Sequence, residues 1–231
     1  MITSGMRKGA GILCITYMAV QSFQWWVFSK APLPESSGIK DFLFSAEPIS
    51  VVRSWLMLLS MFALFFIFFV LCFDQPGKNK AWNFIAFCGF SVFCLLEVIL
   101  RSIELFYTQI QLPGEYLAAS TAQQEIILSY VIQFQKIQGA LYFPLGFSQM
   151  LGSFILALVF PATPQRNYVI KAVLYFNGIR LLLRTITGYL GVELFPDPIY
   201  GTLYLPMVYL MFGLKAWWLL AQRKSAQAVI S

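Results

Sequence analysis

The sequence contains no histidine and few charged side chains, and both absences restrict what the protein can be. Without histidine, the common histidine-containing ligand sets for zinc and haem cannot be assembled. Only 11% of the 231 residues are charged, whereas a soluble domain has about 25%. Hydrophobic residues make up 59% of the chain. We therefore expect an integral membrane protein that uses no metal ion or other cofactor.

Cysteine is also scarce. Cys14, Cys72, Cys88 and Cys94 stand at scattered positions within apolar stretches. Thiols at different depths of a membrane do not form a disulfide framework. We interpret these four residues as small packing residues.

Six apolar stretches are each long enough to cross a membrane as a helix, which takes about 20 residues for a hydrocarbon core of about 30 Å. They are residues 9–28, 51–73, 81–107, 138–160, 168–190 and 200–221. This leaves no room for a separate soluble domain, so we expect one all-α, polytopic transmembrane domain over residues 1–231. A basic start before an apolar stretch also occurs in cleaved signal peptides, but residues 9–28 are long enough to favour a retained span.

Basic residues are concentrated at alternate ends of these stretches. They precede the first span, join the second to the third and the fourth to the fifth, and follow the sixth: Arg7, Lys8, Lys78, Lys80, Arg166, Lys171, Arg223 and Lys224. By the positive-inside rule, both termini are cytoplasmic. Topology thus explains the net charge of +6, and we expect neither a nucleic-acid nor a soluble protein partner.

Lys215 follows the same pattern. It stands beside Trp217 and Trp218 near the inner end of the sixth span. Lysine side chains can extend to the membrane surface, and tryptophan is enriched there. We therefore expect Lys215 to be an interfacial anchor.

The second and fourth spans have distinctive patterns. Residues 56–73 are apolar on every face apart from Ser60, a pattern that suits lipid contact or deep burial, and we expect the second span to be peripheral for most of its length. Before the fourth span, the Pro-Gly pair in residues 112–115 predicts a helix break, and Ser120 or Thr121, with Gln123 or Gln124 three residues later, resembles a capping box. A helix from there to residue 160 would be about 60 Å long, which exceeds a bilayer. We therefore expect an extracytoplasmic helical extension before the fourth span.

One row of polar side chains crosses the third span. Glu97, Arg101, Glu104 and Thr108 are spaced by four, three and four residues, which puts them on one helix face. A lone charge at hydrocarbon depth costs about 2.5–3.5 kcal/mol, so these charges need partners. Arg101 can meet both glutamates, which leaves one carboxylate for another helix or for water.

A second polar row crosses the fifth span, at Asn177, Arg180, Arg184 and Thr187. Counted from the span centres, Glu97 and both arginines lie within about 8 Å of the midplane on the outer side. This predicts a polar pocket that opens to the extracytoplasmic side. The candidate ligand-binding residues are Arg53, Arg101, Gln138, Asn177, Arg180, Arg184 and Tyr204, and the candidate catalytic residues are Glu97 and Glu104.

These charges allow a structural and a functional interpretation. Glu97 and Glu104 could pair with the arginines of the fifth span in an ionic lock that fixes helix packing. However, the four candidate arginines exceed the two glutamates by two charges. The planar guanidinium of arginine binds a carboxylate or a phosphate through two parallel N–H donors. The excess of positive charge therefore favours a site that binds or handles an anionic amphiphile, such as a lipid headgroup or an isoprenoid phosphate. The partner would be a membrane lipid or a hydrophobic small molecule.

Two other functions remain open. Glu97 could act as general acid or base in an intramembrane enzyme, for example a cyclase or isomerase of a hydrophobic substrate. The chain could also be a proton-coupled small-molecule transporter in which Glu97 carries the proton. The sequence shows no pair of broken helices and no clear internal repeat in favour of transport.

The layout resembles that of a known family. A basic start before residues 9–18, Arg53 at the head of the second span, Arg101-Ser-Ile-Glu104, and a long outer connection into Gln138-Gly-Ala-Leu-Tyr142 are similar to bacterial six-span inner-membrane proteins known as domain of unknown function 4386. The likeness covers nearly the whole chain, although the inner loop at residues 161–166 differs from the serine-glycine turn typical of the family. It implies a six-span fold in a bacterial inner membrane and implies no particular chemistry.

Overall fold

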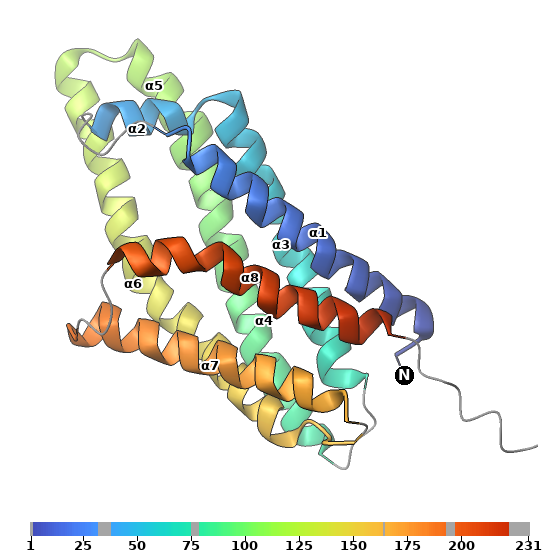
Figure 1. Cartoon of the computed structure of the whole chain (residues 1–231). Helices are drawn as coiled ribbons and strands as arrows, with labels where there is room; N and C mark the ends of the chain where they lie inside the picture. The colour runs from blue at the N-terminus through green and yellow to red at the C-terminus, as the bar shows by residue number, and fades with distance from the viewer. Residues whose placement is uncertain (1, 32–37, 75–78, 164, 193–196, 222–231) are drawn as a thin grey trace, which may run out of the picture.

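The computed structural model describes residues 2–31, 38–74, 79–163, 165–192 and 197–221, and within these ranges it contains helices and no strand. The helices are α1 (Ser4–Phe28), α2 (Gly38–Ser45), α3 (Pro48–Phe73), α4 (Lys80–Ser102), the π-helix η1 (Ile103–Gln111), α5 (Leu112–Ala118), α6 (Thr121–Val159), α7 (Asn167–Leu190) and α8 (Asp197–Leu220). Figure 1 shows their arrangement. The predicted all-α class is confirmed.

Four of the described segments are long and apolar enough to cross a membrane: Pro48–Phe73, Lys80–Ala118, Thr121–Val159 and Thr202–Leu220. They indicate a membrane protein. Helices α1 and α7 occupy the predicted first and fifth spans with 25 and 24 residues, but polar side chains make them less apolar than these four. That α1 and α7 also cross the membrane stays a prediction.

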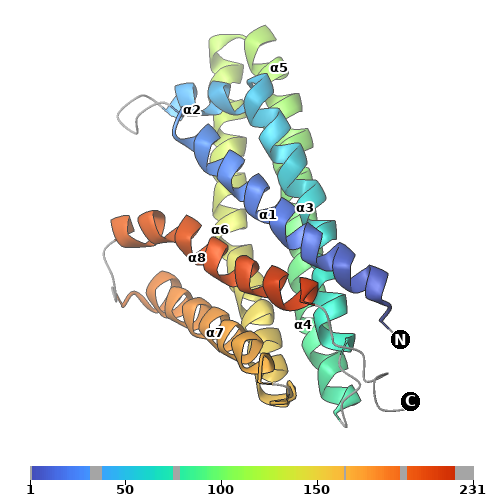
Figure 2. The same ribbon diagram turned by 45° about the vertical axis from the view of Figure 1, so that its right-hand side comes forward.

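The six long helices form a closed ring. Going round it, α1 packs against α3, α3 against α4, α4 against α6, α6 against α7, α7 against α8, and α8 against α1. Figures 1 and 2 show α6, and α4 together with its continuation through η1 and α5, running the length of the bundle, while α7 and α8 cover only part of it. The contact between α7 and α8 is the least extensive of the six.

Helix α3 is not peripheral, contrary to the sequence prediction. Its most apolar stretch is 56% buried, the largest share among the four membrane-crossing candidates. The Phe68 ring stacks on Phe90 of α4 with ring centroids 4.1 Å apart. The prediction was wrong because a surface that is apolar all round suits the interior of a bundle as well as lipid.

Two glycines allow α4 and α6 to approach closely. A Cβ atom at Gly89 would lie 2.7 Å from the carbonyl oxygen of Ser148, and one at Gly152 would lie 2.9 Å from that of Ala86. Real Cβ atoms do not approach backbone oxygens so closely, so a larger residue would push the helices apart. Small residues are the usual means of close helix packing in membranes.

Helix α6 is as long as the sequence predicts, while the extracytoplasmic location of its first half stays a prediction. Helix α6 has 39 residues, about 58 Å at 1.5 Å per residue. It begins at the first of the two predicted capping boxes, in which the Ser120 N–H donates to Gln123 Oε1 at 3.1 Å. Its first half packs with α2 and α5 at one end of the molecule, through Phe42, Leu112, Tyr116 and Ile127 (Figure 1).

The predicted helix break at residues 112–115 is wrong, because the chain passes from α4 through η1 into α5 without interruption. The Leu112 N–H donates to the carbonyl of Tyr107, five residues earlier, so the winding is π-helical there. Pro113 follows in the first turn of α5. Pro113 lacks the N–H that would donate to the preceding turn, yet the helical winding continues past it to Ala118.

Candidate functional site

The charged row of the third span forms a chain of ion pairs. Arg101 Nε lies 3.2 Å from Glu97 Oε2, and Arg101 Nη1 lies 2.8 Å from Glu104 Oε2. The other oxygen of Glu104 lies 3.2 Å from Nη2 of Arg53, which comes from α3. The carboxylate that the row leaves in excess therefore finds its partner on a neighbouring helix.

The π-helix shapes this network. Glu104 lies in the first turn of η1, and Gln109 Nε2, five residues on, donates to Glu104 Oε1 at 3.4 Å. A contact between residues five apart follows from the wider π-helical winding. Such windings occur frequently at functional sites.

These pairs differ from those of the ionic-lock hypothesis. The two glutamates pair with Arg101 and Arg53, and within the described residues no ion pair links either glutamate to Arg180 or Arg184. The arginines of α7 therefore face a different environment.

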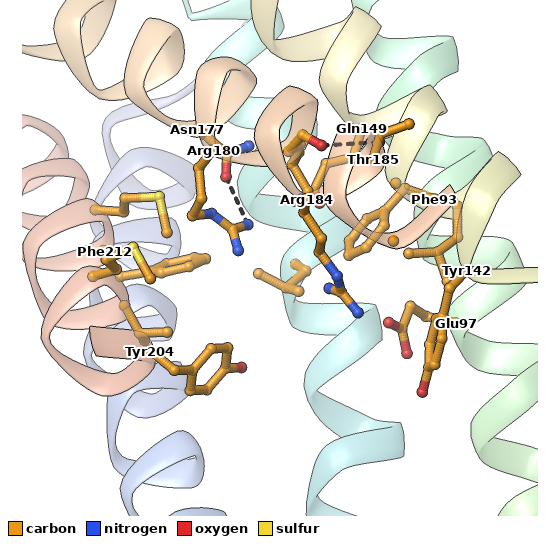
Figure 3. A pocket seen from close by; sticks show the side chains of 18 of the residues that line it. Phe93, Glu97, Tyr142, Gln149, Asn177, Arg180, Arg184, Thr185, Tyr204 and Phe212 are labelled. Atoms are coloured by element: carbon orange, nitrogen blue, oxygen red, sulfur yellow. Dashed lines mark hydrogen bonds between the residues drawn. The ribbon is translucent and has the colours of Figure 1, made fainter. Parts of the chain in front are cut away.

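That environment is a cavity of about 470 Å³ enclosed by the ring, to which all six long helices contribute side chains. Figure 3 shows Arg180 and Arg184 extending from α7 into the space, with Glu97 of α4 facing Arg184 and Tyr204 on the side of α8. Five of the nine predicted site residues line it: Glu97, Asn177, Arg180, Arg184 and Tyr204.

The arginines of α7 are oriented by neighbouring side chains. Asn177 Nδ2 donates to Ser153 Oγ of α6 at 2.9 Å, and Asn177 Oδ1 accepts from Arg180 Nη2 at 3.1 Å. The guanidinium carbon of Arg184 lies 5.5 Å from the centroid of the Tyr142 ring. Arg184 is exposed, and none of the ion pairs between described residues includes it. Arg184 can therefore bind an anionic ligand without first breaking an ion pair with a carboxylate.

A second hollow, of about 500 Å³, adjoins the cavity where α1, α7 and α8 meet. The two spaces share Arg180, Arg184, Gly188, Tyr204 and Met207, so the arginines stand between them. We call this second hollow the mouth.

Two unsatisfied polar atoms lie in the mouth. Gln24 Oε1 and Thr187 Oγ1 are buried without a hydrogen-bond partner, and both residues line it. Because buried polar atoms are nearly always hydrogen-bonded, a ligand or water is expected to bond them. Across the same space, the Tyr204 hydroxyl donates to Gln21 Oε1 at 2.7 Å.

Lys215 is not an interfacial anchor, so this prediction is wrong. The residue is 3% exposed and lines the cavity. Its Nζ lies 4.4 Å from the centroid of the Phe212 ring and 5.6 Å from that of Phe68. No hydrogen bond or ion pair joins Lys215 to another described residue.

The sequence contained a signal for this placement. Tyr204, Val208, Met211 and Lys215 follow one another at spacings of four, three and four, and all four line the cavity. The neighbouring tryptophans were misleading, because Trp218 is fully buried and donates from Nε1 to Asn167 Oδ1 at 2.9 Å.

The remaining predicted residues lie outside the cavity. Arg53 and Arg101 take part in the ion pairs described above. Glu104 and Gln138 line a separate hollow of about 570 Å³ between α2, η1 and α6. Glu97 and Glu104 therefore do not face a common space, as a pair of catalytic carboxylates would.

The described part of the chain contains no cluster of side chains that could hold a metal ion and no disulfide. No three His, Cys, Asp or Glu side chains there lie together in a way that could hold a metal ion. All four cysteines are free, and three of them are buried. This agrees with their interpretation as packing residues.

No protein-family model matches the sequence, and neither a curated protein nor a solved structure gives a match. The resemblance to the six-span family therefore stays a prediction. Any function must be argued from the cavity and its mouth.

Proposed function

We propose that this chain is a six-span protein of the bacterial inner membrane with both termini in the cytoplasm, and that its cavity binds an anionic amphiphile. In this arrangement α1 and α7 supply the first and fifth spans. One observation carries the proposal: Arg184 lines both the cavity and the mouth and takes part in none of the ion pairs between described residues, while the one acidic lining residue of the cavity in the described chain, Glu97, already pairs with Arg101. An anionic group would balance the charge of Arg184.

The anionic group would lie at the boundary between mouth and cavity, beside Arg184 and Arg180. A guanidinium presents two parallel N–H donors, which suit a carboxylate or a phosphate. The Thr187 hydroxyl can donate a further hydrogen bond, and the Gln24 amide can bond polar atoms of a headgroup. A lipid headgroup and an isoprenoid phosphate share this chemistry.

The apolar part of the ligand has two surfaces to contact. Trp25, Phe28 and Met207 line the mouth, and Leu64 and Phe93 line the cavity. The cavity volume of about 470 Å³ falls within the usual range for small-molecule sites, about 300–1,000 Å³, most of which are largely apolar with a few polar groups. A long chain would extend through the mouth into the bilayer.

Native mass spectrometry of the detergent-purified protein tests the proposal, with wild type beside Arg184→Gln and Arg166→Gln. Arg166 is a matched control, because it stands at the opposite end of α7 and donates to the Ala221 carbonyl at 3.4 Å. We expect wild type and Arg166→Gln to retain one anionic species and Arg184→Gln to lose it. A wild-type protein that stays empty after incubation with anionic lipid and with isoprenoid phosphate would contradict the proposal. Whether the wild type retains the anionic lipid or the isoprenoid phosphate identifies the class of the ligand.

Acid–base catalysis by Glu97 is the second candidate. Of the two predicted catalytic glutamates, Glu97 alone lines this cavity, where it stands beside Tyr142 (Figure 3). General acid–base catalysis requires the group within hydrogen-bond reach of the substrate. Once the ligand is known, turnover that survives in Glu97→Gln would exclude this role.

A further inference from the structure

We propose that Lys215 captures apolar aldehydes as a covalent imine within the cavity. The amine is buried, faces a cavity with aromatic walls, and has no hydrogen bond or ion pair with another described residue. This site is separate from the anionic site at the mouth and does not depend on it.

The surroundings of Lys215 are those that make lysine a nucleophile. A lysine attacks carbonyl carbon as the neutral amine, which is favoured when the side chain is desolvated in an apolar pocket or lies beside another cation. Lys215 meets the first condition, because it is 3% exposed and its Nζ lies among aromatic rings. No acidic residue of the described chain pairs with Lys215 and holds it as an ammonium ion.

The reaction needs no oxidant or reductant. The Nζ lone pair attacks the aldehyde carbon, and a proton moves from nitrogen to oxygen to give the carbinolamine. Loss of the hydroxyl group, as water with one added proton, gives the C=N bond of a protonated imine. The net change is aldehyde plus neutral amine plus one proton to protonated imine plus water.

The product would also be stabilised by its surroundings. A protonated imine is a cation, and cations are attracted to the faces of aromatic rings. The rings of Phe212 and Phe68 already lie 4.4 Å and 5.6 Å from Nζ. The apolar chain of the aldehyde would occupy the space beside Leu64 and Met211.

Reductive trapping tests the proposal. The full-length protein in detergent at pH 7 is incubated with dodecanal and sodium cyanoborohydride, which reduces imines to stable amines, and peptides are then mapped by mass spectrometry. We expect one dodecyl group on Lys215, formed at least about ten times faster than on the exposed Lys40 and Lys136, because desolvation in an apolar pocket activates a lysine as a nucleophile. Adducts of the neighbouring Cys14 thiol would not survive, because a thiohemiacetal reverts to the free thiol.

The variants separate this proposal from the anionic site. Lys215→Arg should lose the adduct, whereas Arg184→Gln should keep it even if bound anionic lipid is lost. Modification of Lys40 and Lys136 without Lys215 in the wild type would overturn the proposal, and this result does not require any variant to fold. If Lys215 is unmodified and Lys215→Met releases a bound anionic species, the lysine is an anion ligand and the imine proposal is wrong.

Discussion

Arg53 Nη2 of α3 and Glu104 Oε1 of η1 lie 3.2 Å apart, with side chains that are 9% and 17% exposed. Arg101 pairs with the other oxygen of Glu104, so one carboxylate joins two guanidinium groups. Arg53 also lies over the Phe28 ring, 4.7 Å from its centroid. This arrangement ties α1, α3 and η1 together beside the cavity.

Loss of Arg53 should therefore destabilise the protein. We expect Arg53→Ala to lower the free energy of unfolding by about 3 kcal/mol, because breaking a buried pair leaves the other charge partly uncompensated. Unfolding in mixed micelles with increasing SDS provides the measurement. The double variant Arg53→Ala/Glu104→Gln should lose less than the sum of the two single losses. Additive losses would show that the two side chains are not coupled.

Arg7 should contribute to stability in a way that its neighbour Lys8 does not. Arg7 donates to the carbonyls of Trp218 at 2.6 Å and Leu219 at 2.9 Å, and lies 3.2 Å from Asp74 Oδ2, whereas Lys8 is exposed. We expect Arg7→Ala to cost about 3 kcal/mol and Lys8→Ala less than about 0.5 kcal/mol. Both variants remove one positive charge from the same end of α1, so a topology role alone would predict equal effects. Equal SDS midpoints for the two variants would contradict the structural role of Arg7.

The close approach of α4 and α6 predicts that Gly89 tolerates no larger residue. In Gly89→Ala the new methyl would lie 2.7 Å from the Ser148 carbonyl oxygen, so the helices must move apart. We expect a loss of about 1–3 kcal/mol, the usual cost of overpacking. Gly114→Ala is the control, because a Cβ there meets nothing within 4 Å. If the two variants have the same thermal stability in detergent, the α4–α6 spacing is not as described.

Lys215→Met should stabilise the ligand-free protein. A buried polar group without a hydrogen-bond partner costs about 1–3 kcal/mol, and an apolar residue of similar volume avoids this cost. Lys136, exposed on α6, is the control, and Lys136→Met should change stability by less than about 0.5 kcal/mol. A loss of stability in Lys215→Met, measured by SDS titration, would show that the amine has a stabilising partner.

Much of the architecture could be predicted from local patterns. The all-helical class and the membrane character follow from apolar stretches, and the start of α6 follows from the Ser120–Gln123 spacing. The pairing of Arg101 with Glu97 and Glu104 was also predictable, because residues three and four apart meet on any helix.

The tertiary structure alone decided which helix faces meet. Packing pairs Glu104 with Arg53 of α3 and buries much of α3 in the bundle. It also places Lys215, which the sequence predicts to be an interfacial anchor, in the wall of the cavity. Helix periodicity defines which residues share a face, but whether that face meets lipid, water or another helix depends on the packing of residues far apart in sequence. The amino-acid sequence by itself thus determined the helices and their internal ion pairs, and the packing of the ring created the cavity.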